Sequence, residues 1–126
     1  MIKGIDHVAV VATDVKRAAK FYTEVLGMRE VARLETSHSG TLVFVGLGGT
    51  LVELFGGGKP KAEGETDEVG YRHICLGVDD VDAEYERIKG LGVDFYMEPT
   101  TVESGLRIAF FRDPDGSPIE LMQRPK

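Results

Sequence analysis

Apolar residues recur along the chain first with the period of two that is typical of strands, then with the spacing of a helix. Residues 5–12 alternate as a strand that is apolar on both faces, and Thr13-Asp14 supplies side chains that cap a helix. Gly27 is suited to end that helix. The apolar stripe between them consists of Val15, Ala18, Ala19, Tyr22, Val25 and Leu26. Strands are predicted next at 28–34, 41–47 and 50–55, so the first half has the order βαβββ.

The same order begins again after a polar segment, residues 56–70, whose glycines and charges indicate a linker. A strand is predicted at 71–78, and Asp79-Asp80 caps a second helix. The stripe of this helix is Val81, Tyr85, Ile88 and Leu91. The last three strands are predicted at 93–97, 106–112 and 118–122.

The repeat can be checked by the spacing of its polar residues. Asp14 follows His7 by seven positions, as Asp80 follows His73, and Glu53 follows His7 by 46 positions, whereas Glu120 follows His73 by 47. The sequence therefore predicts an α+β fold with two βαβββ modules, about 1–55 and 71–126, within a single domain of residues 1–126. Because one module cannot easily bury its own sheet, we expect one curved mixed sheet with the helices outside.

Two glutamates interrupt apolar strands, Glu53 in the first half and Glu120 in the second. A buried charge without a partner costs several kcal/mol, so each needs a partner. The apolar residues Ile74, Leu76 and Val78 are expected beneath the helix, which places His73 on the opposite, concave face, and the repeat places His7 likewise. We therefore predict that these two histidines and two glutamates converge on one divalent metal ion.

The donors do not select the metal, because nickel, zinc, cobalt, manganese and iron all accept imidazole and carboxylate ligands. Taken singly, each residue has a plainer explanation: a histidine in the core, or a glutamate paired with an arginine. Only the matched spacing of all four favours a metal site. Three further residues are candidates for contact with substrate: Arg107 and Phe111, which share a strand face, and Cys75, which shares the face of His73. A small buried thiol is also common as plain packing.

Composition restricts the class of protein. The chain has a net charge of −6 and 42% hydrophobic residues, with no basic run, so nucleic acid is not expected as a partner. No apolar segment approaches the ~20 residues that span a bilayer. One cysteine and a start without a signal peptide are typical of a cytoplasmic protein.

The sequence resembles the vicinal oxygen chelate superfamily, which includes glyoxalases, bleomycin resistance proteins and extradiol dioxygenases. The motifs are Asp6-His7-Val8-Ala9-Val10, the segment 18–28, Arg72-His73-Ile74, and Asp113-Pro114-Asp115-Gly116 followed by Ile119-Glu120-Leu121. The resemblance implies paired βαβββ modules around a divalent metal, a small-molecule substrate and a homodimer. The metal site is then either within one chain or across the interface of the dimer.

A ligand set of His, Glu, His, Glu resembles glyoxalase I, the lactoylglutathione lyase. This implies a lyase or isomerase that moves a proton between adjacent carbons through a metal-bound enediolate, with Glu120 as the base and Glu53 opposite. The arginine that holds the glutathione carboxylate in such enzymes is replaced by Val11, so the thiol cosubstrate stays open. Alternatives are an epimerase of the methylmalonyl-CoA type and a non-enzymatic drug-binding module of the bleomycin-resistance type.

Overall fold

The computed structural model describes residues 1–37, 40–60 and 69–126, and it divides the chain into two compact units, residues 1–61 and 62–126. The division falls within the predicted linker, of which residues 61–68 lie outside the described residues. The α+β class and the βαβββ repeat are confirmed. The ladder hydrogen bonds of the described strands define two four-stranded sheets, one in each unit, and not one continuous sheet. That the two units build a single domain stays a prediction.

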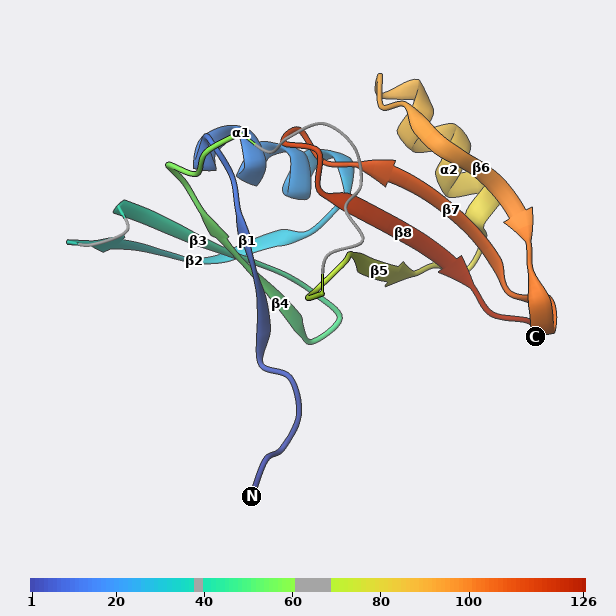
Figure 1. Ribbon diagram of the computed structural model, residues 1–126, viewed down its shortest axis with the longest axis horizontal. Coiled ribbons are helices and arrows are strands. Elements are labelled where there is room, and N and C mark those ends of the chain that lie inside the picture. Colours follow the sequence, from blue (N-terminus) through green and yellow to red (C-terminus); the bar gives the residue numbers. More distant parts are fainter. Residues whose placement is uncertain (38–39, 61–68) are drawn as a thin grey trace. The chain divides into compact units, whose positions relative to one another are not determined.

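In its described part, the first unit contains one helical segment and four strands (Figure 1). Its elements are β1 (His7–Val11), α1 (Val15–Lys20), the π-helix η1 (Phe21–Val25), β2 (Arg29–Thr36), β3 (Gly40–Leu47) and β4 (Thr50–Phe55). The strand order is β1-β4-β3-β2, with β1 parallel to β4 and the other pairs antiparallel. The turn at Gly48-Gly49 lies in the gap between the predicted strands and joins β3 to β4. Both glycines have positive φ angles, 58° and 84°, as a tight hairpin turn requires.

The second unit repeats this topology. Its elements are β5 (Ile74–Gly77), α2 (Val81–Gly90), β6 (Phe95–Thr101), the short 3-10 helix η2 (Glu103–Gly105), β7 (Arg107–Arg112) and β8 (Pro118–Gln123). The order β5-β8-β7-β6, again with one parallel pair between the first and last strands, matches that of the first unit. The strand predicted at 71–78 is shorter than expected and begins one residue after His73.

Both helices begin at the predicted caps. The Asp14 carboxylate accepts hydrogen bonds from the amides of Lys16 and Arg17, at 2.9 and 3.2 Å, and that of Asp80 accepts one from Ala83 at 3.1 Å. Each cap satisfies amides that have no partner within the helix.

The first helix differs from the prediction in its second half. A single helix was expected up to Leu26, but the last turns are π-helical, and the Leu26 amide donates to the Phe21 carbonyl five residues back. The extra residue per turn lets Phe21 and Tyr22 both face the interior, where they are 9% and 1% exposed. Gly27, at φ +76°, ends the segment as predicted.

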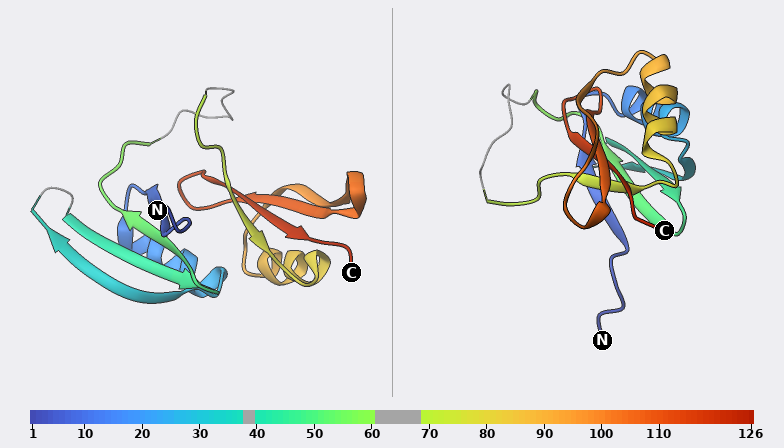
Figure 2. Two further views of the ribbon diagram at one scale, coloured as in Figure 1. Left: turned by 90° about the horizontal axis from the view of Figure 1, so that it is seen from below. Right: turned by 90° about the vertical axis from the view of Figure 1, so that its right-hand side faces the viewer.

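Each sheet buries one face beneath its own helix, as Figure 2 shows for α2 against β6, β7 and β8. The buried residues alternate along the strands and are at most 3% exposed: Val43, Val45, Val52 and Leu54 in the first unit, and Ala109, Phe111, Ile119 and Leu121 in the second. Since neighbouring residues of a strand point to opposite faces, Glu53 and Glu120 lie on the face away from the helix, as predicted.

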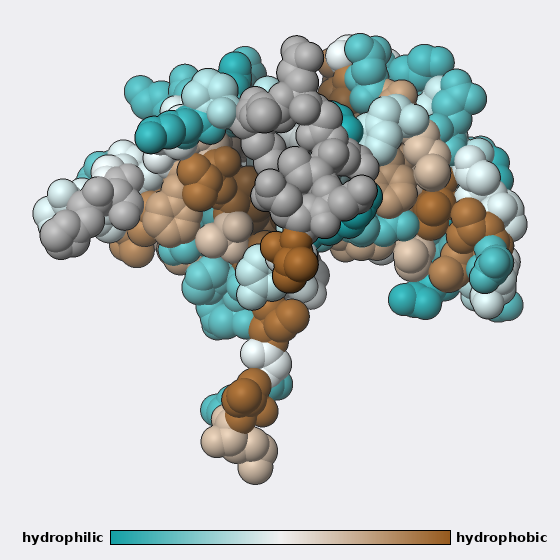
Figure 3. Space-filling view, viewed as in Figure 1, coloured by the Kyte–Doolittle hydropathy of each residue, from teal (hydrophilic) through white to brown (hydrophobic). Residues whose placement is uncertain are grey.

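No helix within the described ranges is long and apolar enough to cross a membrane. The segment that leads into β1 exposes large apolar side chains, visible in brown in Figure 3. These are Met1, Ile2 and Ile5, the least exposed of which is 81% accessible.

Candidate functional site

In the first unit, a histidine and a glutamate meet on the sheet face away from the helix. Glu53 lies in the middle of β4, flanked in register by Ala9 of β1 and Phe44 of β3. Nε2 of His7, the first residue of β1, is 3.5 Å from Oε1 of Glu53. The His7 ring packs edge-on against Phe44 at 5.4 Å between centroids. The parallel β1–β4 pairing is therefore what brings two residues 46 positions apart together.

The second unit repeats this arrangement with the corresponding residues. Glu120 of β8 is flanked by Cys75 of β5 and Phe110 of β7. Nε2 of His73 is 2.9 Å from Oε1 of Glu120, and the His73 ring packs edge-on against Phe110 at 5.2 Å. This pair is the tighter of the two, and Glu120 is buried.

The supporting phenylalanines were missed by the sequence reasoning. Phe44 and Phe110 occupy equivalent rungs of the two sheets, each directly beside the glutamate in the antiparallel register. The signal was present, because Phe110 follows Phe44 by 66 positions, the same interval as from His7 to His73. Each phenylalanine presents an apolar wall that limits the orientations of its histidine ring.

The residue before each histidine differs between the two units. Asp6 Oδ2 lies 2.8 Å from Nδ1 of His7, and this hydrogen bond, assisted by the charge of Glu53, raises the pKa of His7. With Nδ1 held by Asp6, Nε2 is the nitrogen that faces Glu53. A carboxylate on the remote nitrogen is the usual companion of a histidine that binds metal. The position that matches Asp6 is occupied by Arg72 in the second unit.

The donor atoms fit a divalent ion, since an imidazole nitrogen and a carboxylate oxygen in each unit are ligands that nickel, zinc, cobalt, manganese and iron(II) accept. Among the described residues, each unit brings two such donors together. Over residues 1–37, 40–60 and 69–126, no three His, Cys, Asp or Glu side chains form a metal-binding group. Protein metal centres normally use three or more protein ligands. One ion on all four residues therefore requires both pairs, and their convergence stays a prediction.

Two of the predicted substrate contacts lie on the other face of the second sheet. Phe111 is 0% exposed and packs against Phe95 at 4.9 Å, which makes it a core residue. Arg107 binds both carboxylate oxygens of Asp82 on α2, at 2.6 and 2.8 Å. Both side chains were correctly placed on one strand face, but this is the face beneath the helix. The strand is apolar on both sides, so alternation alone does not tell which side is buried.

Cys75, the third predicted contact, does lie on the face of Glu120. The residue is exposed as a whole, but partial burial of its sulfur raises the pKa of the thiol to about 11, and the Glu120 carboxylate contributes further. Cys75 is therefore protonated at neutral pH and is not poised as a nucleophile.

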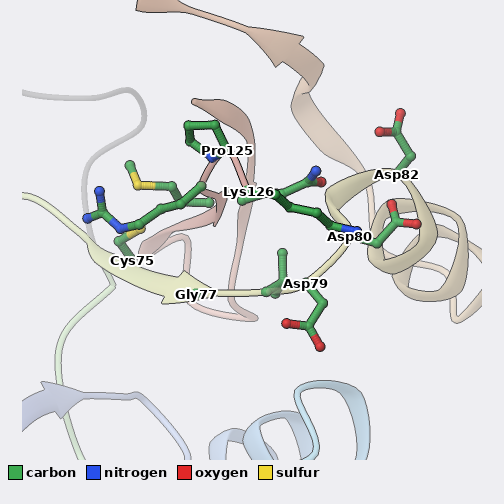
Figure 4. Close-up of a pocket in the computed structure, with 11 residues that line it drawn as sticks. Cys75, Gly77, Asp79, Asp80, Asp82, Pro125 and Lys126 are labelled. Carbon is green, nitrogen blue, oxygen red and sulfur yellow. The ribbon is translucent and has the colours of Figure 1, made fainter. Parts of the chain in front are cut away.

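A pocket of about 1000 Å³ opens beside Cys75 and was not predicted (Figure 4). It is lined by residues of the second unit alone. Met122 of β8 lies on the same face as Glu120, and Arg124 and Lys126 belong to the segment that follows this strand. Asp79 and Asp80, which precede α2, also line it, and Figure 4 shows the Lys126 side chain extending toward Asp80. Sequence reasoning missed the pocket because the last predicted strand ends at residue 122, and no structure was predicted for residues 123–126.

Comparison with known proteins identifies a family for this chain and several proteins of similar sequence or structure. Residues 4–121 match the family model described as the Glyoxalase/Bleomycin resistance protein/Dioxygenase superfamily. A probable lactoylglutathione lyase of Vibrio parahaemolyticus is 38% identical over 93% of this chain and 88% of its own length. The lactoylglutathione lyase of Haemophilus influenzae is 36% identical over 93% and 90%. An antibiotic binding protein from Streptomyces has a similar structure, with a TM-score of 0.80 and 30% identity over 98% of each chain.

Proposed function

The chain belongs to the glyoxalase/bleomycin resistance protein/dioxygenase superfamily, and we propose that it is a metal-dependent lyase or isomerase of the glyoxalase I kind. One observation carries this proposal: each unit holds a histidine and a glutamate in contact, at corresponding positions of equivalent strands. The names of two relatives, lactoylglutathione lyase and probable lactoylglutathione lyase, support a reaction of the lyase or isomerase class. A binding module has no need for two such pairs, because burial of carboxylates costs free energy.

His7, Glu53, His73 and Glu120 are the residues that would hold the ion. A bound divalent cation acts as a Lewis acid and stabilises negative charge that develops on a substrate oxygen. The donor set of two imidazoles and two carboxylates is neutral overall once a divalent ion is bound, which suits an ion that still has to accept substrate oxygens.

Two carboxylates allow one proton to be taken and one to be returned. In this proposal Glu120 removes the proton from one carbon of the substrate and Glu53 faces the adjacent carbon. The assignment of Glu120 as the base is supported by its burial, because few water molecules then compete for the substrate proton, and by its contact with His73, which orients the carboxylate. Glu53 is less buried and sits farther from its histidine.

The substrate proposed is the hemithioacetal of a 2-oxoaldehyde and a thiol. Glutathione is the thiol in the names of the relatives. The test is turnover of methylglyoxal with glutathione, and with other thiols, by the metal-loaded chain. We expect Glu120→Gln to lower kcat by at least about a hundredfold, the typical contribution of a positioned general base, while the fold is kept. Activity of the Glu120→Gln chain equal to that of the wild type would remove the proposed base.

A ligand-binding module is the second candidate, favoured by the similarity to the antibiotic binding protein. The two candidates separate in deuterated solvent. A lyase or isomerase incorporates solvent deuterium into the product carbon, whereas a binding module leaves every carbon-bound proton in place. Deuterium uptake at the α-carbon of an acyl thioester, without turnover of any hemithioacetal, would instead identify an epimerase.

The proposal also includes a homodimer in the cytoplasm. A pair of chains provides two copies of each histidine–glutamate pair, which is sufficient for two complete metal sites. Sedimentation equilibrium checks this part of the proposal, with a mass near twice 13.8 kDa expected and a mass of one chain against it.

A further inference from the structure

We propose that Asp6 is a positioning residue for the metal ion: it holds the Nδ1 proton of His7, so that Nε2 of this histidine presents its lone pair on the side of Glu53. The second unit has no such residue, so His7 is the stronger of the two histidine ligands. This inference rests on the metal site proposed above, and it gives a role to a residue outside the four ligands.

The ring of His7 has a carboxylate near each of its two nitrogens. Nδ1 lies 2.8 Å from Oδ2 of Asp6, whereas Nε2 lies 3.5 Å from Oε1 of Glu53. A neutral imidazole carries one proton, and an ionised carboxylate only accepts hydrogen bonds. The shorter contact is therefore the hydrogen bond, in which Nδ1–H donates to Asp6. Nε2 keeps its lone pair, as a histidine nitrogen that binds metal must.

The position of Asp6 suits support of the ligand and not ligation itself. Its Oδ2 atom lies at Nδ1, on the edge of the ring away from Nε2. Among the described residues, His7 is the only partner of the Asp6 side chain in a hydrogen bond or ion pair. The Phe44 ring meets the same imidazole edge-on at 5.4 Å. Phe44 thus restricts the orientation of the His7 ring, and Asp6 fixes which of its nitrogens carries the proton.

The second histidine is held in the opposite way. Nε2 of His73 lies 2.9 Å from Oε1 of Glu120, and within the described part of the chain no group is hydrogen-bonded to its Nδ1. Because the Glu120 carboxylate accepts, the one proton of neutral His73 lies on Nε2. This proton has to leave Nε2 before the nitrogen can bind an ion. Arg72, a cation, occupies the position that corresponds to Asp6. Of the two histidines, His7 is therefore the one that its neighbours prepare for a metal ion.

The alternative is that Asp6 and His7 form an ordinary surface pair. The Asp6 side chain is 86% exposed, and exposed pairs contribute little to stability. Loss of such a pair leaves metal affinity unchanged. A carboxylate that orients a ligating histidine, in contrast, contributes about tenfold to a hundredfold to metal affinity. Metal affinity therefore separates the two roles, and the stability of the fold does not.

The first test is the zinc affinity of the full chain, measured by competition with a chromophoric chelator. Asp6→Ala should weaken zinc binding about tenfold to a hundredfold, while urea unfolding without zinc is nearly unchanged. Asp6→Asn keeps an oxygen that accepts the hydrogen bond from Nδ1, so it should lose clearly less affinity. Asp6→Ala with the zinc affinity of the wild type overturns the proposal, and so does Asp6→Asn that is as weak as Asp6→Ala.

The matched control is Glu84→Gln, which removes one negative charge from α2, where Glu84 pairs with Arg87 at 2.7 Å. This helix covers the other face of the sheet. The variant should bind zinc as the wild type does, and a loss equal to that of Asp6→Ala would attribute the effect to net charge and overturn the proposal.

The second test observes the proton itself by nuclear magnetic resonance of the zinc-loaded chain. It uses His38→Gln as background, which leaves His7 and His73 as the two histidines of the chain. Asp6 should protect the Nδ1 proton of His7 from exchange with solvent, whereas an Nδ1 proton of His73 exchanges fast. We therefore expect one slowly exchanging imidazole proton, which disappears in Asp6→Ala. No such proton, two of them, or one that persists in Asp6→Ala overturns the proposal.

The inequality of the two histidines has its own measurement. His7→Ala should weaken zinc binding about tenfold more than His73→Ala does, because it removes the ligand that a carboxylate supports. Equal losses or the reverse order overturn this part. A wild type that binds no zinc contradicts the metal site of the proposed function as well, whereas a wild type that binds zinc while Asp6→Ala is unaffected contradicts only the role of Asp6.

Discussion

Two neighbouring phenylalanines provide a sharp test of which face of the second sheet carries the chemistry. Phe111 is 0% exposed and packs in the core beneath α2, whereas Phe110 points the other way and contacts the ring of His73 at 5.2 Å. Truncation of each to alanine removes the same atoms from adjacent positions of one strand. The two variants should nevertheless fail in different ways.

The magnitudes follow from burial. Phe111→Ala opens a cavity in a closed core and should lower the free energy of unfolding by about 3–5 kcal/mol. Phe110 is only half-buried, so its truncation loses part of the transfer free energy and one edge-on aromatic contact, about 1–2 kcal/mol in total. Metal affinity should fall in Phe110→Ala and not in Phe111→Ala, because only Phe110 restricts the orientation of His73.

The assay is urea unfolding followed by far-UV circular dichroism, together with metal titration at a temperature where both variants are folded. Phe111→Leu serves if the alanine variant does not fold, since it keeps most of the volume. A larger loss of stability in Phe110→Ala than in Phe111→Ala would refute the assignment of faces. Intact metal affinity in Phe110→Ala, with a loss in the Phe111 variant, would refute it equally.

Two further predictions concern stability. A Cβ on Gly58 would lie 2.5 Å from a methyl group of Val11, so Gly58→Ala should lower the free energy of unfolding by about 1–3 kcal/mol. Gly90 has open space around it, so Gly90→Ala should not lower the free energy of unfolding. Thermal melting of the two variants tests this difference. The hydrogen bonds from Arg107 hold the pKa of Asp82 below its usual value. The ionised carboxylate therefore stabilises the folded protein at pH values above its unfolded pKa of about 3.9. This stabilisation is lost as the pH falls through the lower pKa of the folded state. Asp82→Asn should therefore be less stable than the wild type at pH 7, and urea unfolding should show the difference shrinking below about pH 4; a difference independent of pH would contradict the ion pair.

Much of the fold was predictable because the same βαβββ pattern occurs in both halves of the sequence. The caps Asp14 and Asp80, the terminal Gly27 and the hairpin at Gly48-Gly49 are local signals, and local signals are what a sequence pattern carries. The repeat then allowed each half to check the other. The π-helical turn from Phe21 was not predictable from spacing, since a shift of one residue leaves the apolar stripe almost unchanged.

The candidate site was predictable in its polar residues and not in its surroundings. A glutamate in an apolar strand is conspicuous, and the matched spacing named its histidine. The choice between Phe110 and Phe111 was not fixed by sequence, because β7 is apolar on both faces and either phenylalanine suits the core. The pocket at Arg124 depends on the path of the chain after β8, which no periodic pattern describes.

The central claim is that the two histidine–glutamate pairs share one ion. The most direct measurement is the number of divalent metal ions per chain, by elemental analysis of the wild type, His7→Ala and His73→Ala, purified in parallel. The account predicts about one ion per chain in the wild type and far less in either variant, because each substitution removes one of the four donors that hold the single ion and so weakens its binding. A wild type without metal, or variants that each keep half of the ions, would contradict it.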